Sequence, residues 1–96
     1  MPKFVIERSI PAIGSASSAE LQAIAQKSCG VLKDLGTGVQ WVQSFVTPEK
    51  IYCIYNSESA ELVKEHARRG GFPADSVAQV KAVIDPTTAE PIAAAG

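Results

Sequence analysis

Short runs of β-branched and aromatic residues alternate along this chain with longer segments whose apolar residues fall at helical spacing. Runs of the first kind are typical of strands, and they predict strands at residues 3–8, 39–46, 51–55 and 77–84. Apolar residues three and four positions apart are typical of an amphipathic helix. They predict helices at residues 17–35 and 60–69. The expected order is therefore β-α-β-β-α-β.

The first helix carries clear signals at both ends. Ser17 and Glu20 have the spacing of a capping box, in which each side chain accepts a bond from the other residue's backbone N–H. Gly36 follows the last apolar residue, and we expect it to cap the helix in the left-handed conformation. Helical spacing places one stripe towards the core, namely Leu21, Ile24, Ala25, Ser28, Val31, Leu32 and Leu35.

The second helix should end at a pair of glycines. Gly70 and Gly71 favour a C-terminus, and Pro73 prevents the helix from continuing. Three- and four-residue steps place four residues inward, namely Val63, His66, Ala67 and Gly70. The single histidine of the chain is therefore expected to face the core.

This order of elements predicts an α+β protein of the ferredoxin-like type. We expect a four-stranded antiparallel sheet with two helices on one face. A short Pro-containing turn at residues 47–50 joins the second and third strands into a hairpin. Residues 1–90 are expected to form one domain, and residues 91–96 a flexible tail.

The strands carry large apolar residues on both of their faces. In residues 39–46, strict alternation places Val39, Trp41, Gln43 and Phe45 on one face, and Gln40, Val42, Ser44 and Val46 on the other. A sheet with one solvated face should alternate more cleanly. We therefore expect a homodimer in which two sheets pack face to face, the dimeric α/β-barrel arrangement.

Charge and composition exclude several classes of function. Nine basic and ten acidic side chains nearly cancel, so binding to nucleic acid has no electrostatic support. Apolar runs fall well short of the roughly 20 residues that span a bilayer, and residues 1–8 do not form a signal-peptide apolar region. Two cysteines without CxxC spacing suggest neither a disulfide framework nor a zinc knuckle. We expect a reduced, cytoplasmic protein that binds no membrane.

Three residues could carry chemistry. His66 is either a structural helix-end histidine or a group facing the cleft between helix and sheet, where it could act as a base or a ligand. Cys53, in the third strand, is either a buried inert thiol or a soft ligand for a transition metal. Glu7 either lies at the surface or, if buried, needs a partner such as His66.

Four motifs follow one another along the chain, namely I-E-R-S-I-P, V-Q-W-V-Q-S-F-V-T, E-K-I-Y-C-I-Y and E-H-A-R-R-G-G-F-P, and V-I-D-P-T-T-A-E follows them. In this order they resemble a small bacterial family first catalogued as a domain of unknown function and now labelled nickel-binding protein. The resemblance covers about residues 3–90. It implies a ferredoxin-like protomer, a dimer, and binding of nickel or another divalent transition metal. The resemblance does not supply the ligands themselves. In a metal-binding protein of this sequence we expect His66 as the nitrogen ligand, with Cys53 or Glu7 completing the site.

Three kinds of function remain open at this point. The first is a metal-binding homodimer. The second is a cofactor-independent enzyme for a small organic molecule, with His66 as general base oriented by Glu7. The third is an interaction module without a small ligand. The matched motifs and the pocket expected for an enzyme supply the ligand-binding candidates, namely Arg8, Trp41, Ser44, Tyr52, Tyr55 and Phe72.

Overall fold

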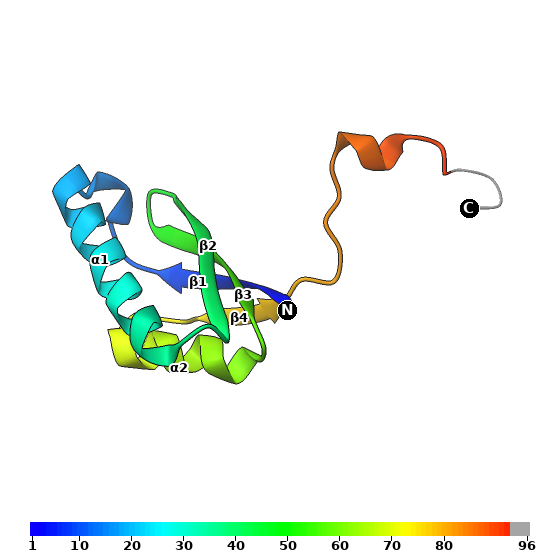
Figure 1. Cartoon of the computed structure of the whole chain (residues 1–96). Helices are drawn as coiled ribbons and strands as arrows, with labels where there is room; N and C mark the ends of the chain where they lie inside the picture. The colour runs from blue at the N-terminus through cyan, green and yellow to red at the C-terminus, as the bar shows by residue number, and fades with distance from the viewer. Residues whose placement is uncertain (93–96) are drawn as a thin grey trace.

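The computed structural model describes residues 1–92 and shows an α+β fold with four strands and two long helices (Figure 1). The four strands form one antiparallel sheet in the order β2-β3-β1-β4. This confirms the predicted ferredoxin-like order. The elements are β1 (Lys3–Ser9), η1 (Ile13–Ser15), α1 (Ser18–Leu35), β2 (Val39–Val46), β3 (Lys50–Ser57), α2 (Ala60–Gly70), β4 (Ser76–Gln79) and η2 (Pro86–Ala89).

The ends of the helices follow local side-chain chemistry. The capping box before α1 is present, because Ser17 Oγ accepts from the Glu20 N–H at 3.1 Å and the Glu20 carboxylate accepts from the Ser17 N–H at 3.3 Å. At α2 the cap is one-sided, because Ser59 Oγ accepts from the Leu62 N–H at 3.3 Å, and Gly71 ends the helix in the left-handed conformation. The prediction for Gly36 was wrong in one respect. Its φ is 85° but its ψ is −161°, so it caps α1 outside the left-handed helical region.

Both helices pack on one face of the sheet, and the core lies between them and the strands. Val63 from α2 and Ile6 from β1 are both fully buried. His66 is 0% exposed and Ala67 is 3% exposed, so the predicted inward face of α2 is confirmed. Leu21, Ile24, Leu32 and Leu35 of α1 pack against the same cluster.

A β-bulge in β2 overturns the predicted alternation of that strand. Trp41 pairs with Tyr55 and Gln43 pairs with Ile54, so Val42 is an extra residue between them. From Gln43 onward the faces are therefore opposite to the expectation. Trp41, Ser44 and Val46 face the helices, whereas Gln43 and Phe45 face away from them. Strict alternation fails because one inserted residue reverses every later side chain.

The loop between β1 and α1 is tied to the β2–β3 turn. The Gly14 N–H donates to the Pro48 carbonyl at 3.0 Å, and the Ile10 N–H donates to the Glu49 carbonyl at 3.1 Å. A Cβ at Gly14 would lie 2.6 Å from Pro48 Cα, which only glycine avoids. Ile13, at the start of η1, is 7% exposed and joins the core. These contacts fix where α1 begins relative to the sheet.

The last strand is shorter than predicted. It was expected over residues 77–84, but β4 ends at Gln79 and pairs only with Phe4 to Glu7 of β1. The Val80 N–H makes the final bond, to the Lys3 carbonyl. Beyond it the chain leaves the sheet and reaches η2, which Asp85 caps (Figure 1). Of the tail expected at residues 91–96, Pro91 and Ile92 are exposed and the rest lies outside the described residues.

The sheet face turned away from the helices, here called the open face, is partly apolar. Its apolar members are Val5, Phe45, Tyr52, Ile54 and Ala78. Phe45 is 53% exposed. Within residues 1–92, no helix is long and apolar enough to cross a membrane.

Candidate ligand-binding site

A cavity of about 250 Å³ lies between α1 and the helix-facing side of the sheet. Its walls are largely aliphatic and aromatic. Arg8 is the single charged residue in the lining found within the described chain. The lining residues are Arg8, Ile10, Leu21, Ile24, Ala25, Ser28, Trp41, Ser44, Val46, Ile51, Cys53, Tyr55 and Phe72.

The floor of the cavity follows directly from strand register. Residues paired across neighbouring strands share a face of the sheet, and three such rows of β1, β3 and β2 supply the floor. All their members except Ile6 and Phe4 line the cavity. The rows are Arg8, Ile51 and Val46; then Ile6, Cys53 and Ser44; then Phe4, Tyr55 and Trp41. The bulge at Val42 is what allows Trp41 and Ser44 to belong to the same floor.

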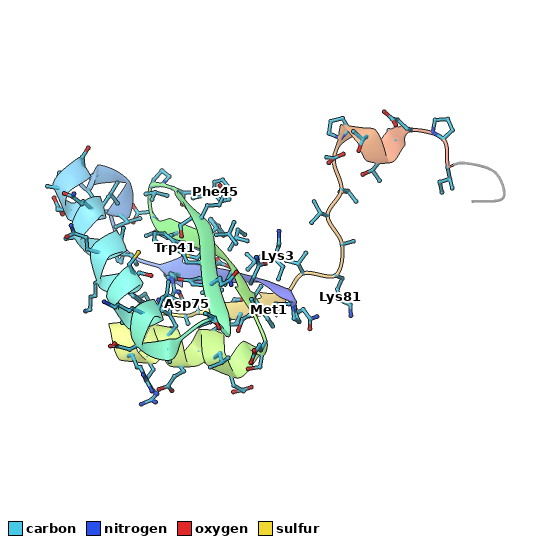
Figure 2. The ribbon with its side chains drawn as sticks, in the orientation of Figure 1. Met1, Lys3, Trp41, Phe45, Asp75 and Lys81 are labelled. Carbon is cyan, nitrogen blue, oxygen red and sulfur yellow. The ribbon has the colours of Figure 1, made fainter. Side chains whose placement is uncertain are left out.

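The other walls come from α1 and from the segment after α2. Leu21, Ile24, Ala25 and Ser28 form the first part of the predicted apolar stripe of α1. Phe72 closes one side, and Figure 2 shows Trp41 on the α1 side of β2. These walls leave an opening to the surface, because Val46 in the lining is 42% exposed.

Arg8 is buried but makes contacts only to neutral groups. It is 3% exposed. Its Nε donates to Cys53 Sγ at 3.4 Å, one Nη donates to the Pro73 carbonyl, and the other to the Tyr55 hydroxyl at 3.5 Å. Its Cζ lies 5.5 Å from the centre of the Phe72 ring. Three ion pairs occur in residues 1–92, and all of them involve other residues.

His66 lies behind the cavity wall and reaches it through Ser28. The Ser28 Oγ and the His66 Nε2 are 3.0 Å apart, and Ser28 itself lines the cavity. The His66 Nδ1 is buried without a hydrogen-bond partner among the described residues. Burial, helped by the nearby Arg8 charge, lowers the pKa of His66. The imidazole is therefore neutral at pH 7.

Two aromatic residues of the cavity floor, Tyr55 and Trp41, each carry a polar group at the cavity. Burial raises the pKa of Tyr55, so its hydroxyl stays protonated at physiological pH and can donate a hydrogen bond. The Trp41 indole N–H donates to Ser44 Oγ at 2.9 Å. This bond holds the indole in place against the cavity.

The structure brings together most, but not all, of the residues predicted from the sequence. Five of the six ligand-binding candidates line the cavity, namely Arg8, Trp41, Ser44, Tyr55 and Phe72, and the metal candidate Cys53 joins them. Tyr52 does not, because it lies on the open face.

Glu7 also lies on the open face, where its carboxylate forms an ion pair with Lys50. The expected pairing of Glu7 with His66 is therefore not formed among the described residues.

Ser28 is the polar contact that the sequence interpretation did not assign. A signal for it exists in retrospect. Ser28 is the one polar residue on the apolar stripe of α1, and His66 is the one polar residue on the inward face of α2. Two isolated polar residues on helices that share a core are candidates for bonding each other, because a buried polar group needs a partner.

The described residues of this chain do not fit a nickel centre. They contain no group of three or more His, Cys, Asp or Glu side chains placed to hold a metal ion. Of the predicted set, Glu7 is on the opposite face of the sheet from His66 and Cys53. The guanidinium of Arg8 lies against the Cys53 sulfur, and this positive charge opposes a cation there.

The fold and the cavity together define an α+β protein of the ferredoxin-like class with an apolar pocket beneath its first helix. The chain belongs to the family described as nickel responsive protein SCO4226-like, whose model matches residues 4–80. The family prediction from the sequence motifs is thus confirmed, although the V-I-D-P-T-T-A-E segment lies beyond the matched range.

A solved structure supports the same assignment. The crystal structure of SCO4226 from Streptomyces coelicolor A3(2) matches with a TM-score of 0.72 and 26% sequence identity. The match covers 85% of this chain and 99% of that one. A comparison with the curated proteins found no match.

Proposed function

We propose that this protein binds a small organic molecule in the cavity between α1 and the sheet. The observation that carries the proposal is the cavity itself, an apolar pocket with a few polar groups gathered around Arg8. Ligand sites are concave and mostly apolar, with few polar groups that orient the ligand. A cavity of about 150 Å³ holds benzene, so one of about 250 Å³ suits a somewhat larger fragment.

Filling the cavity tests this proposal. Ala25 on α1 lines the cavity, whereas Ala23 on the same helix is exposed. Ala25→Leu places extra carbon atoms in the pocket, and Ala23→Leu makes the same change on the solvent side. Trp41 is the single tryptophan of the chain and lines the pocket, so its fluorescence reports occupancy.

The probes are hexanoate, hexanamide, 3-phenylpropanoate and 3-phenylpropanamide, titrated into wild type and both variants. We expect at least one of them to bind wild type and Ala23→Leu alike, and to bind Ala25→Leu about tenfold or more weakly, because the added atoms occupy the ligand's space. Failure of all four probes to change the fluorescence or the thermal midpoint of wild type would contradict the proposal.

The position of His66 favours binding over catalysis. Ser28 stands between the imidazole and the cavity, and Glu7 is on the far side of the sheet. The general-base role expected for an enzyme would need His66 within hydrogen-bond reach of a bound molecule.

Nickel binding is the second candidate, and the family's description as nickel responsive is the finding that favours it. Because the described residues of one protomer lack three suitable donors, we propose that a bound divalent ion takes donors from two copies of the chain.

The test of nickel binding uses tag-free protein titrated with Ni²⁺ in a calorimeter. We expect saturation at fewer than one ion per chain, and weaker binding after Glu7→Gln, because Glu7 is the member of the predicted metal set that lies on the open face, where two copies would meet. Uptake of a full equivalent that Glu7→Gln does not change would refute this assignment.

A homodimer is the proposed assembly. The support is the open face, where Phe45 is half exposed beside the apolar residues already named. Phe45→Asp should convert a dimer into a monomer in light scattering, since it buries a charge in the interface. Val83→Asp is the matched control, because Val83 is 71% exposed and lies off the sheet. A wild-type mass equal to one chain would exclude the dimer.

A further inference from the structure

We infer that the molecule held in the cavity is a carboxylate attached to an apolar body, and that Arg8 binds its anionic group. This inference rests on the proposed function and names the chemical class of the ligand. It starts from the one charged residue of the cavity lining found in the described chain.

Arg8 lacks the partner that a buried guanidinium normally has. Buried charges in proteins are paired, because desolvation disfavours an isolated ion. Arg8 is 3% exposed, yet its contacts are a thiol sulfur, a backbone carbonyl and a phenol oxygen, all formally neutral. Within residues 1–92 no carboxylate pairs with it.

The guanidinium of Arg8 has more donors than the described residues use. Arginine has five N–H groups in a planar fork, and the protein uses three of them, one on each nitrogen. Each Nη therefore keeps one N–H without a partner among the described residues. Two N–H groups on the two Nη atoms are what a carboxylate takes in a bidentate pair.

The neighbouring groups fit an anion and not a cation. The Tyr55 hydroxyl lies 3.5 Å from Arg8 Nη and stays protonated, so it can donate to a carboxylate oxygen. Phe72 covers the guanidinium at 5.5 Å from ring centre to Cζ, and it lies against Gly70, where a Cβ would come within 2.3 Å of the ring. The cation therefore sits in a fixed position.

The rest of the cavity fits the apolar body of the ligand. Besides Arg8, the walls carry the apolar side chains of Ile10, Leu21, Ile24 and Val46. A molecule with one charged end and one hydrocarbon end satisfies both regions. Straight-chain and aryl-substituted carboxylic acids share this chemistry, and the two are separated by experiment.

The test compares acids with their uncharged amides. Hexanoate and hexanamide form the straight-chain pair, and 3-phenylpropanoate and 3-phenylpropanamide form the aromatic pair. Binding is measured by Trp41 fluorescence and by calorimetry. We expect at least one acid to bind about tenfold or more tightly than its amide, since a hydrogen bond to a charged group contributes more than a neutral one. The pair with the larger difference identifies the body.

Arg8→Met should abolish this preference, so that acid and amide bind equally. Arg8→Lys keeps the charge without the fork and should retain part of it. Lys27→Met is the control, because Lys27 is an exposed cation whose Nζ lies 5.7 Å from the centre of the same Phe72 ring. It should leave the preference unchanged. Circular dichroism and the thermal midpoint establish that each variant is folded.

The outcomes separate the two proposals. Equal binding of acid and amide to wild type overturns the anion inference and leaves the cavity as a ligand site. Loss of the preference in Lys27→Met but not in Arg8→Met also overturns it, because the anion then binds outside the cavity. Binding of none of the four probes overturns the proposed function and the inference with it.

Discussion

Replacing Ser28 by alanine removes the hydrogen bond between α1 and α2 that connects His66 to the cavity wall in the described structure. Ser28 is 5% exposed and His66 is 0% exposed, and their polar atoms are 3.0 Å apart. The His66 Nδ1 already lacks a partner in the described structure. Ser28→Ala therefore leaves both ring nitrogens of a buried imidazole unsatisfied.

The expected loss follows from that burial. A buried polar group left without its partner destabilises a protein by about 1–3 kcal/mol, and the missing hydroxyl adds little volume change. For a domain of this size, each kcal/mol lowers the thermal midpoint by about 4–8 °C. Ser28→Ala should thus lower the midpoint by at least several degrees. Ser18→Ala, an exposed serine on the same helix, should change the free energy of unfolding by less than about 0.5 kcal/mol.

A double-mutant cycle with His66→Leu measures the contact itself. Urea denaturation of wild type, the two single variants and the double variant gives four free energies of unfolding. Since the double variant has no stranded imidazole, its loss should be smaller than the sum of the single losses by about 1 kcal/mol. Losses that simply add, or a Ser28→Ala variant as stable as Ser18→Ala, would refute the role given to this bond.

Three further outcomes follow from the structure. Burial puts the folded-state pKa of His66 below its ordinary 6.5, so the unfolded state binds more protons in this range. The free energy of unfolding should therefore fall as the pH drops below about 6.5 towards that lower pKa. His66→Leu should lack this decline. Of the two thiols, exposed Cys29 should react with a thiol reagent faster than buried Cys53 in the native protein, and unfolding should remove the difference; equal rates in the native protein would contradict this. Gly14→Ala should lower the free energy of unfolding by about 1–3 kcal/mol, because the new Cβ clashes with the β2–β3 turn. Gly30→Ala has open space around it in α1 and should raise the free energy of unfolding by about 0.5–1 kcal/mol. Denaturant midpoints check both.

The sequence predicts the elements well because local chemistry determines them. The Ser17–Glu20 capping box and the Gly71 C-cap act within a few residues, and both are present in the structure. The length of β4 is different, since it depends on how far β1 offers pairing partners. A local pattern carries no information about that limit.

The sequence predicts which residues form the candidate site better than it predicts how they are arranged in space. The sequence analysis names both Glu7 and Arg8 as site candidates, and the structure shows that Arg8 is the one buried at the cavity. The bulge at Val42 leaves no mark in the alternation of residues 39–46, and it decides that Ser44 faces the cavity. The Ser28–His66 bond joins residues 38 positions apart, and only packing brings them together.

The bulge at Val42 has a second consequence, for how the molecule behaves at high concentration. Strand β2 is one edge of the sheet, and the four-residue β4 is the other. A long, straight edge strand exposes unpaired N–H and C=O groups that can pair with a strand of another molecule, and such pairing promotes fibril growth. Here one edge is interrupted by an irregular residue and the other is short. We therefore expect this protein to resist edge-to-edge polymerisation, so that contacts between copies form through faces of the sheet.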